Sequence, residues 1–174
     1  MPDATAFPSP DPSSLALARP TDEHLREIMT WFSTEEKLRT WGGPDIRFPF
    51  DARTFEEDMK INEFASYAVV GAGGELIGFG QIYERLGRAH LARLVVAPAK
   101  RGRGYGRRLL EAIARKGREL LGVKENSLFV YHHNTIAHRC YHEAGFVETA
   151  YPEKGEFYAE IVYMVRGENQ PAEG

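Results

Sequence analysis

Two stretches of this 174-residue chain combine residue types and spacings that could do chemistry. The first is the basic glycine loop Arg101-Gly102-Arg103-Gly104-Tyr105-Gly106, which lies between an apolar run and an amphipathic segment. A strand that enters a helix through glycines directs backbone N–H groups and the positive end of the helix dipole at one point. Glycines let the backbone approach an anion, and Arg101, Arg103 and Arg107 add positive charge. The loop therefore predicts a phosphate site, with a flexible basic surface turn as the alternative.

Other phosphate-binding motifs match this loop less well. The sequence has no GxxxxGK[ST] pattern, so a Walker loop is excluded. The loop stands in the middle of the chain without the acidic ribose partner of a dinucleotide fold.

The second stretch runs from Asn134 to Phe146 and places Tyr141 four residues after Ala137. On a helix this spacing puts both residues on one face, so that both can border the same cleft. A phenol with a pKa near 10 can give a proton to a departing thiolate whose conjugate acid has a pKa near 8.5. Tyr141 is therefore a candidate general acid, and a half-buried core tyrosine is the alternative. Asn134 could position a ligand through its amide or cap the helix.

Histidines gather around the same helix, but we expect no metal site. A zinc site needs converging ligands with supporting carboxylates, and if the helix turns Tyr141 toward a cofactor, His138 and His142 point to its flank. Cys140 is not part of a recognisable Cys-His-Asp constellation and is not expected to be a nucleophile.

The elements that must position these residues follow from hydrophobic periodicity, capping residues and glycine turns. They alternate between strands and helices, which predicts a mixed α/β sandwich. Strands are expected at 15–19, 66–70, 75–83, 89–96, 127–131 and 157–165, and helices at 21–32, 34–41, 51–62, 106–121 and 135–144.

Length and composition indicate one domain at 15–166, between loose segments at 1–14 and 167–174. Cys140 is the only cysteine, so no internal disulfide can form and a reducing cytoplasm is the expected location. No run approaches the roughly 18 apolar residues of a membrane helix. The net charge of −3 favours neither nucleic acid nor a membrane surface as a partner.

The two stretches together resemble motifs A and B of the GNAT acetyltransferases. Leu94 to Pro98 followed by Arg101-x-x-Gly104-x-Gly106 is similar to motif A, and Asn134-x-x-Ala137-x-x-x-Tyr141-x-x-x-Gly145-Phe146 is similar to motif B. The resemblance implies a GNAT-type mixed β-sheet with a splayed strand pair and helices on both faces. It also implies acetyl-CoA as cosubstrate, with pantetheine along the backbone of Leu94, Val95 and Val96. Pyrophosphate would lie on the amides of Gly102 to Arg107.

By the same resemblance, Asn134, Ala137 and Tyr141 border the cofactor, and Tyr141 is the general acid. Some histone-type members carry a glutamate eleven residues before the Gln or Arg of motif A, and His90 stands at that position here. An imidazole with a pKa near 6.5 could serve as the base, with Glu84 or water as competitors.

The expected activity is transfer of an acetyl group from acetyl-CoA to a primary amine by direct attack. A non-catalytic acyl-CoA sensor of the same fold is the alternative. The acceptor, a small molecule or a protein amine, would lie against 28–50 and 150–156, where Trp31, Trp41, Phe48 and Phe50 suit an apolar body. A homodimer is a further expectation.

Overall fold

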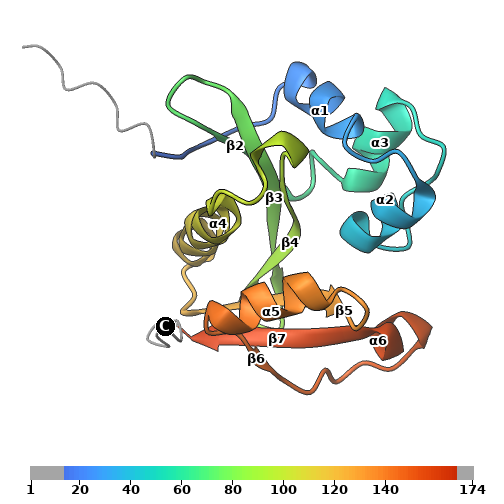
Figure 1. Ribbon diagram of the computed structural model, residues 1–174. Helices are drawn as coiled ribbons and strands as arrows, with labels where there is room; N and C mark the ends of the chain where they lie inside the picture. The colour runs from blue at the N-terminus through green and yellow to red at the C-terminus, as the bar shows by residue number, and fades with distance from the viewer. Residues whose placement is uncertain (1–13, 168–174) are drawn as a thin grey trace, which may run out of the picture.

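The computed structural model describes residues 14–167, which form a seven-stranded sheet in the order β1-β2-β3-β4-β5-β7-β6 (Figure 1). Its strands are β1 (Ala16–Ala18), β2 (Ala65–Val70), β3 (Leu76–Arg85), β4 (Arg88–Val96), β5 (Glu125–Tyr131), β6 (Val147–Glu148) and β7 (Ile161–Gly167). The helices are α1 (Asp22–Met29), α2 (Glu35–Gly42), α3 (Ala52–Met59), α4 (Tyr105–Leu121), α5 (Thr135–Glu143) and α6 (Glu156–Glu160), with a 3-10 turn at Pro98–Lys100.

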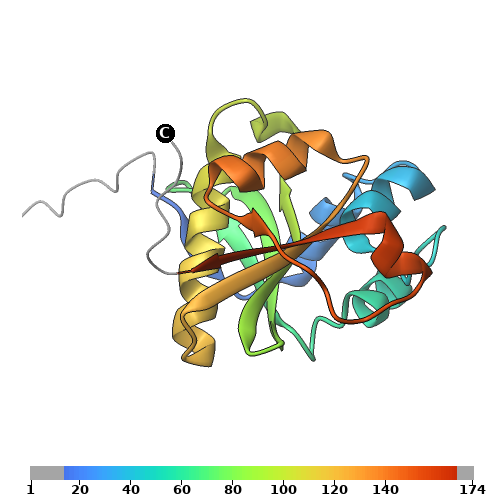
Figure 2. The same cartoon turned by 90° about the horizontal axis from the view of Figure 1, so that it is seen from below.

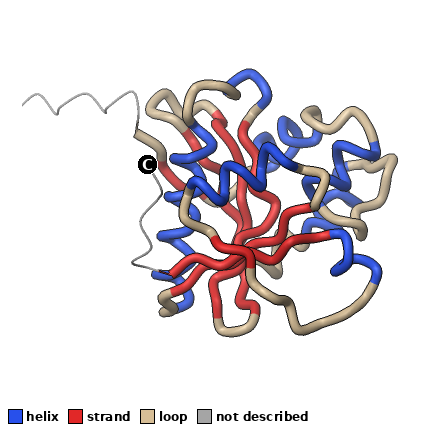
Figure 3. Tube along the Cα trace, turned by 60° about the horizontal axis from the view of Figure 1, so that its bottom comes forward, coloured by secondary structure: helices blue, strands red, loops and turns tan. Residues whose placement is uncertain are grey.

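The sheet is mixed and has helices on both faces. β4 and β5 are parallel, and every other neighbouring pair is antiparallel. Helix α4 lies on one side of β2–β4 and helices α1 to α3 on the other (Figures 1 and 2), while β7 runs below these strands in the view of Figure 1. Figure 3 shows the same strands enclosed by helices from another side. The predicted fold class, a mixed sheet flanked by helices on both faces, is confirmed.

The parallel pair at the centre separates part of the way along. Ala89, His90 and Leu91 pair with Asn126, Ser127 and Leu128, and no later residue of β4 pairs with β5 within residues 14–167. The register between β3 and β4 shifts between Phe79 and Gln81, where Arg93 takes a left-handed φ of 52°. This bulge bends β4 away from β5 and leaves its edge from Ala92 to Val96 without a strand partner on that side.

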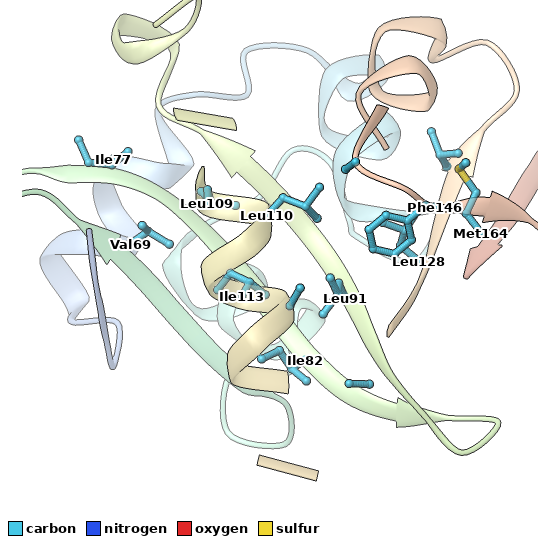
Figure 4. Packing of buried hydrophobic residues seen from close by; sticks show 14 residues of the cluster. Val69, Ile77, Ile82, Leu91, Leu109, Leu110, Ile113, Leu128, Phe146 and Met164 are labelled. Atoms are coloured by element: carbon cyan, nitrogen blue, oxygen red, sulfur yellow. The ribbon is translucent and has the colours of Figure 1, made fainter. Parts of the chain in front are cut away.

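The main core holds this arrangement in place. Apolar side chains of α4 pack onto β2, β3 and β4 on one side of the sheet, and Phe146 and Met164 extend the same cluster over β5 and β7 (Figure 4). The ten labelled residues are all nearly inaccessible to solvent: Val69, Ile77, Ile82, Leu91, Leu109, Leu110, Ile113, Leu128, Phe146 and Met164. A second cluster fills the space between α1–α3 and the other face.

Two expectations about the end of the chain need correction. The strand expected at 157–165 begins only at Ile161, because Gly155 opens the short helix α6, which turns Phe157 and Tyr158 onto Phe129. The two-residue strand β6 was not expected. Of the predicted loose segments 1–14 and 167–174, all but Ser14 and Gly167 lie outside the described residues, and Gly167 is the last residue of β7. No helix within 14–167 is long and apolar enough to cross a membrane.

Candidate active site

A cavity of about 500 Å³ opens where β4 and β5 separate. Its wall includes four of the predicted cofactor-binding residues, namely Leu94, Asn134, Ala137 and Tyr141, and also His90. The splayed strands and α5 therefore bring residues from both motifs to one space. The rest of the wall comes from the end of α2 and the loop after it, from the end of β3, and from α6.

Tyr141 projects from α5 into this cavity and packs its ring edge-to-face on Phe146, with centroids 6.1 Å apart. Its hydroxyl makes no hydrogen bond to any residue of the described chain. Burial, and to a smaller extent Cys140, raises the pKa of Tyr141 above its usual value. The phenol thus keeps its proton and has it free to donate, as a general acid requires.

Asn134 combines the two roles that the sequence left open. Its Oδ1 accepts a hydrogen bond from the backbone N–H of Ala137 at 3.3 Å, which caps the N-terminus of α5. The residue also borders the cavity, and its Nδ2 makes no hydrogen bond within residues 14–167. The cap fixes the residue while the amide nitrogen stays available to a ligand.

The other end of α5 is held by a buried arginine. Arg166, 6% exposed, donates two hydrogen bonds to Glu111 of α4 at 2.7 and 3.1 Å and one to the carbonyl of Ala144 at 2.9 Å. Its guanidinium also lies 4.8 Å from the ring centroid of Phe146. Because Ala144 is the C-cap of α5, this contact ties the helix that carries Tyr141 to α4.

The glycine loop has the backbone geometry that a phosphate site needs. Gly102 and Gly104 have φ of 76° and 80°, and a Cβ added at either would meet no atom within 4 Å. Gly104 is the N-cap of α4 and provides no side-chain cap, so the first N–H groups of the 17-residue helix have no intrahelical acceptor. These residues fit the pyrophosphate of acetyl-CoA, for which the open backbone and the helix dipole supply the donors.

The arginines of the loop are arranged less uniformly. The Nε of Arg101 donates to the carbonyl of Val96 at 3.4 Å, and Arg107 contacts Glu111 and the carbonyl of Glu143, each at 3.4 Å. Arg103 is exposed, and the ring of Tyr105 lies under Arg108 at 5.3 Å.

The loop itself, from Arg101 to Arg107, does not line the cavity, nor do Val95 and Val96. The side chain of Val95 packs with the α1–α3 cluster, and Val96 joins the main core. The side chains of Val95 and Val96 are thus taken up by the two cores, and the expected contact of pantetheine with their backbone stays a prediction.

His90 lies in the cavity wall but in surroundings that differ from those expected. It is 1% exposed, its Nδ1 is 2.9 Å from the Ser127 hydroxyl, and its ring packs between Tyr83 and Phe129. Burial first, and the charge of Arg85 second, lower the pKa of His90 to about 3. The expectation of an imidazole with a pKa near 6.5 at this position is therefore wrong. An imidazole whose pKa is lowered this far is a poor acceptor for the proton of an alkylammonium, so the base is not assigned to His90.

No sequence pattern indicated two arginines of the cavity wall, Arg85 and Arg93. Arg93 donates to the carbonyls of Gly42 at 3.0 Å and Met59 at 3.2 Å, and to Gln81 Oε1 at 2.8 Å. It thereby caps the ends of α2 and α3 and fixes them against the bulge. A single arginine within a predicted strand gives no indication that it caps distant helices or lines a cavity.

The expected acceptor wall is partly correct in place. Trp41 and the loop after α2 border the cavity, whereas Trp31 and Phe50 pack on the α1–α3 core and Phe48 packs edge-to-face on Phe50. Within residues 14–167 no three His, Cys, Asp or Glu side chains gather in a way that could hold a metal ion. Burial raises the pKa of the Cys140 thiol, which disfavours the thiolate.

Solved structures with the same fold belong to acetyltransferases. A spermidine N-acetyltransferase from Vibrio cholerae, in complex with CoA and spermine, superposes with a TM-score of 0.70 at 22% identity, over 91% of this chain and 98% of that one. An acetyltransferase from Thermus thermophilus superposes with a TM-score of 0.65 at 21% identity, over 90% and 98%.

Sequence comparison assigns the family. The profile of the Acetyltransferase (GNAT) family matches residues 25–146, which include both motifs and the strands between them. The chain therefore belongs to the GNAT family and is an acetyl-CoA-dependent N-acetyltransferase.

Proposed function

We propose that this chain transfers the acetyl group of acetyl-CoA to a primary amine by direct attack, with Tyr141 as the general acid. The observation that carries the proposal is the convergence of Leu94, Asn134, Ala137 and Tyr141 on one cavity at the point where β4 and β5 separate. An uncapped helix N-terminus stands at the other end of the splayed strand.

Each part of the site then has its own task. The amides from Gly102 to Arg107 hold the pyrophosphate, and the free edge of Leu94 to Val96 holds the pantetheine by strand-like hydrogen bonds. Acetyl-CoA supplies the activated acyl group. Tyr141 donates the proton of its Oη to the departing sulfur, and Asn134 directs its Nδ2 into the same space.

The acceptor must arrive as the neutral amine. At pH 7 an alkylammonium with a pKa near 10.4 loses its proton at a cost of about 4.6 kcal/mol. Because Arg85 and Arg93 both line the cavity, their charges favour the neutral amine over the ammonium there. We propose that the proton leaves to water, because His90 is too weakly basic to take it.

A coupled assay tests this proposal. The protein is incubated with acetyl-CoA and a panel of primary amines, thiol release is followed, and the acetylated amine is identified by mass spectrometry. We expect release that depends on the amine. Binding of acetyl-CoA without an acetylated product from any amine would favour the sensor function instead. The expected homodimer stays a prediction, which light scattering on the purified protein would test.

A further inference from the structure

The charges of the cavity wall are not those of a site for polycations. The charged side chains that border the cavity within residues 14–167 are Asp45, Arg85 and Arg93, and His90 is neutral above about pH 3. Arg93 is engaged by carbonyls at the ends of α2 and α3, as described above. Neither arginine forms an ion pair within residues 14–167, but Arg93 satisfies helix ends whereas Arg85 contacts only tyrosine hydroxyls and aromatic rings.

The contacts of Arg85 are hydroxyls and aromatic rings. Its Nη1 donates to the Tyr151 hydroxyl at 2.5 Å and its Nη2 to the Tyr83 hydroxyl at 3.2 Å. The guanidinium carbon lies 4.8 Å from the ring centroid of Phe129. No carboxylate of the described chain comes within 4.0 Å, and Glu153 is linked to it through the Tyr151 hydroxyl, which is 3.5 Å from Glu153.

One nitrogen on the outer edge of the guanidinium has an unused donor, while the other nitrogen of that edge, Nη2, donates to the Tyr83 hydroxyl. The Nε of Arg85 is buried and has no hydrogen-bond acceptor within residues 14–167. Nε and Nη2 form the edge that binds a carboxylate through two parallel hydrogen bonds. A buried donor without an acceptor is unfavourable, so an oxygen brought to this edge is favoured.

The neighbouring arginine of the same hairpin shows the contrast. Arg88, which pairs with Arg85 across the β3–β4 turn, forms an ion pair with Glu125 at 2.6 Å and does not line the cavity. Of these two arginines, the one with a carboxylate partner is outside the cavity and the one without is inside it.

A second orphaned donor points to the same ligand chemistry. Trp41 Nε1 is also buried without an acceptor, and Trp41 also borders the cavity. Among residues 14–167, the two buried side-chain atoms without a hydrogen bond are both donors in this wall. Such a wall favours a ligand that brings oxygens and not further N–H groups.

We propose that Arg85 binds a carboxylate of the acceptor, so that the substrate is a small amino acid with an apolar or aromatic body. The inference rests on the proposed acetyl transfer and deepens it. The size of the cavity, about 500 Å³, suits a small molecule. The rings of Phe129, Tyr83 and Tyr158 would surround its body, and a di- or tricationic amine would be repelled by Arg85.

Matched pairs of amines test the inference. Phenylalanine is compared with phenethylamine, and 5-aminopentanoate with pentylamine, so that the members of each pair differ in the carboxylate; spermidine serves as the polycation. Dissociation constants are measured by calorimetry on the protein saturated with CoA, and kcat/KM by thiol release. For at least one pair we expect the carboxylate to strengthen binding by roughly 10- to 100-fold, with spermidine weaker than either member.

Variants assign the preference to the side chain. Arg85→Gln is expected to reduce the ratio within the pair to about 1 by weakening only the amino acid. Arg85→Lys, which keeps the charge without the planar fork, should retain part of the ratio. Arg88→Gln removes the same charge from the same hairpin outside the cavity and should leave the ratio unchanged.

The outcomes separate the inference from the function on which it rests. Equal binding within every pair, or tighter binding of spermidine, would overturn the carboxylate assignment even if amines are acetylated. A ratio that depends on Arg85 in binding, without any acetylated product, would keep the anion site and reject the transfer. If Arg85→Gln does not fold, the wild-type ratio and Arg85→Lys decide.

Discussion

The Tyr141 hydroxyl is the most consequential single group in the cavity, because its proton is unshared and its surroundings are apolar. A raised pKa makes the phenol a weaker acid than the free side chain, so its hydrogen bond to the departing sulfur matters before the proton is transferred. A hydrogen bond to charge that develops on the leaving sulfur stabilises the transition state selectively, and low dielectric strengthens it.

We therefore expect Tyr141→Phe to lower kcat by about 10² while the dissociation constant of acetyl-CoA stays nearly unchanged. Steady-state kinetics and calorimetry measure the two quantities. Tyr67→Phe, which removes a hydroxyl from a tyrosine of β2 at the main core, is the control. Unchanged turnover with chemistry rate-limiting would refute the role, and lost cofactor binding would make Tyr141 a packing residue.

The burial of His90 predicts that the free energy of unfolding depends on pH. The folded protein keeps this imidazole neutral down to about pH 3, whereas the unfolded chain protonates it below about pH 6.5. Between these values the unfolded state binds more protons, so the free energy of unfolding falls as the pH falls, by up to about 1.4 kcal/mol per unit. Above pH 6.5 this contribution is fully present and constant.

Urea unfolding of the wild type and of His90→Asn at pH 7.5 and 5 measures the effect. The variant lacks the titrating group. The difference in free energy of unfolding between the wild type and the variant should therefore be about 2 kcal/mol smaller at pH 5 than at pH 7.5. His132→Asn, which changes an exposed histidine, should leave the pH dependence intact. A constant deficit across this range would mean that His90 is not buried as a neutral ring.

At the scale of elements, local signals predict where helices begin better than where they end. Thr21, Thr34 and Asp51 each accept the expected hydrogen bond from the backbone at the start of α1, α2 and α3. Helix α3 was expected to reach Asn62 but ends at Met59, because Lys60 takes a left-handed conformation with φ of 51°. A lysine there gives no warning, since glycine is the residue typical of that conformation.

In the candidate site, too, features set by local sequence could be predicted and features set by distant elements could not. The positions of the glycine loop, the α5 face and the splayed strand could be predicted from the motifs, because their glycines and their spacing depend on local geometry. The burial of His90 and the aromatic surroundings of Arg85 depend on β5, α6 and the loop before α6, which are distant in sequence. Burial decides the pKa of a histidine, and no pattern within β4 reports it.

Two arginines join these elements where carbonyls would otherwise lack partners. Arg93 satisfies the ends of α2 and α3, and Arg166 satisfies the end of α5. A positive charge at a helix C-terminus also complements its dipole. Arg85 lies in the same fold without a helix end or a carboxylate to satisfy, and this difference in partners is why we assign it to a ligand.

For the molecule as a whole, bound acetyl-CoA should hold the two halves of the sheet together and so stabilise the fold. The splayed strands leave a gap that the ligand would fill only in the folded protein, so binding stabilises the native state by mass action. At 100 times its dissociation constant the ligand contributes about 2.7 kcal/mol, or roughly 5–10 °C in melting temperature for a chain of this size.

Substitution of two glycines at opposite ends of α4 tests where the pyrophosphate of acetyl-CoA binds. Gly104 and Gly122 have φ of 80° and 64°, and an added Cβ would meet no atom within 4 Å at either position. Alanine should therefore strain the backbone similarly at both, by about 1–2 kcal/mol. At Gly104 its methyl group would also stand in the phosphate cradle. We expect Gly122→Ala to show the wild-type thermal shift with acetyl-CoA, and Gly104→Ala to bind at least tenfold more weakly and lose most of the shift. Equal shifts in both variants would move the pyrophosphate away from the N-terminus of α4, while a wild type without any shift would remove acetyl-CoA from the site.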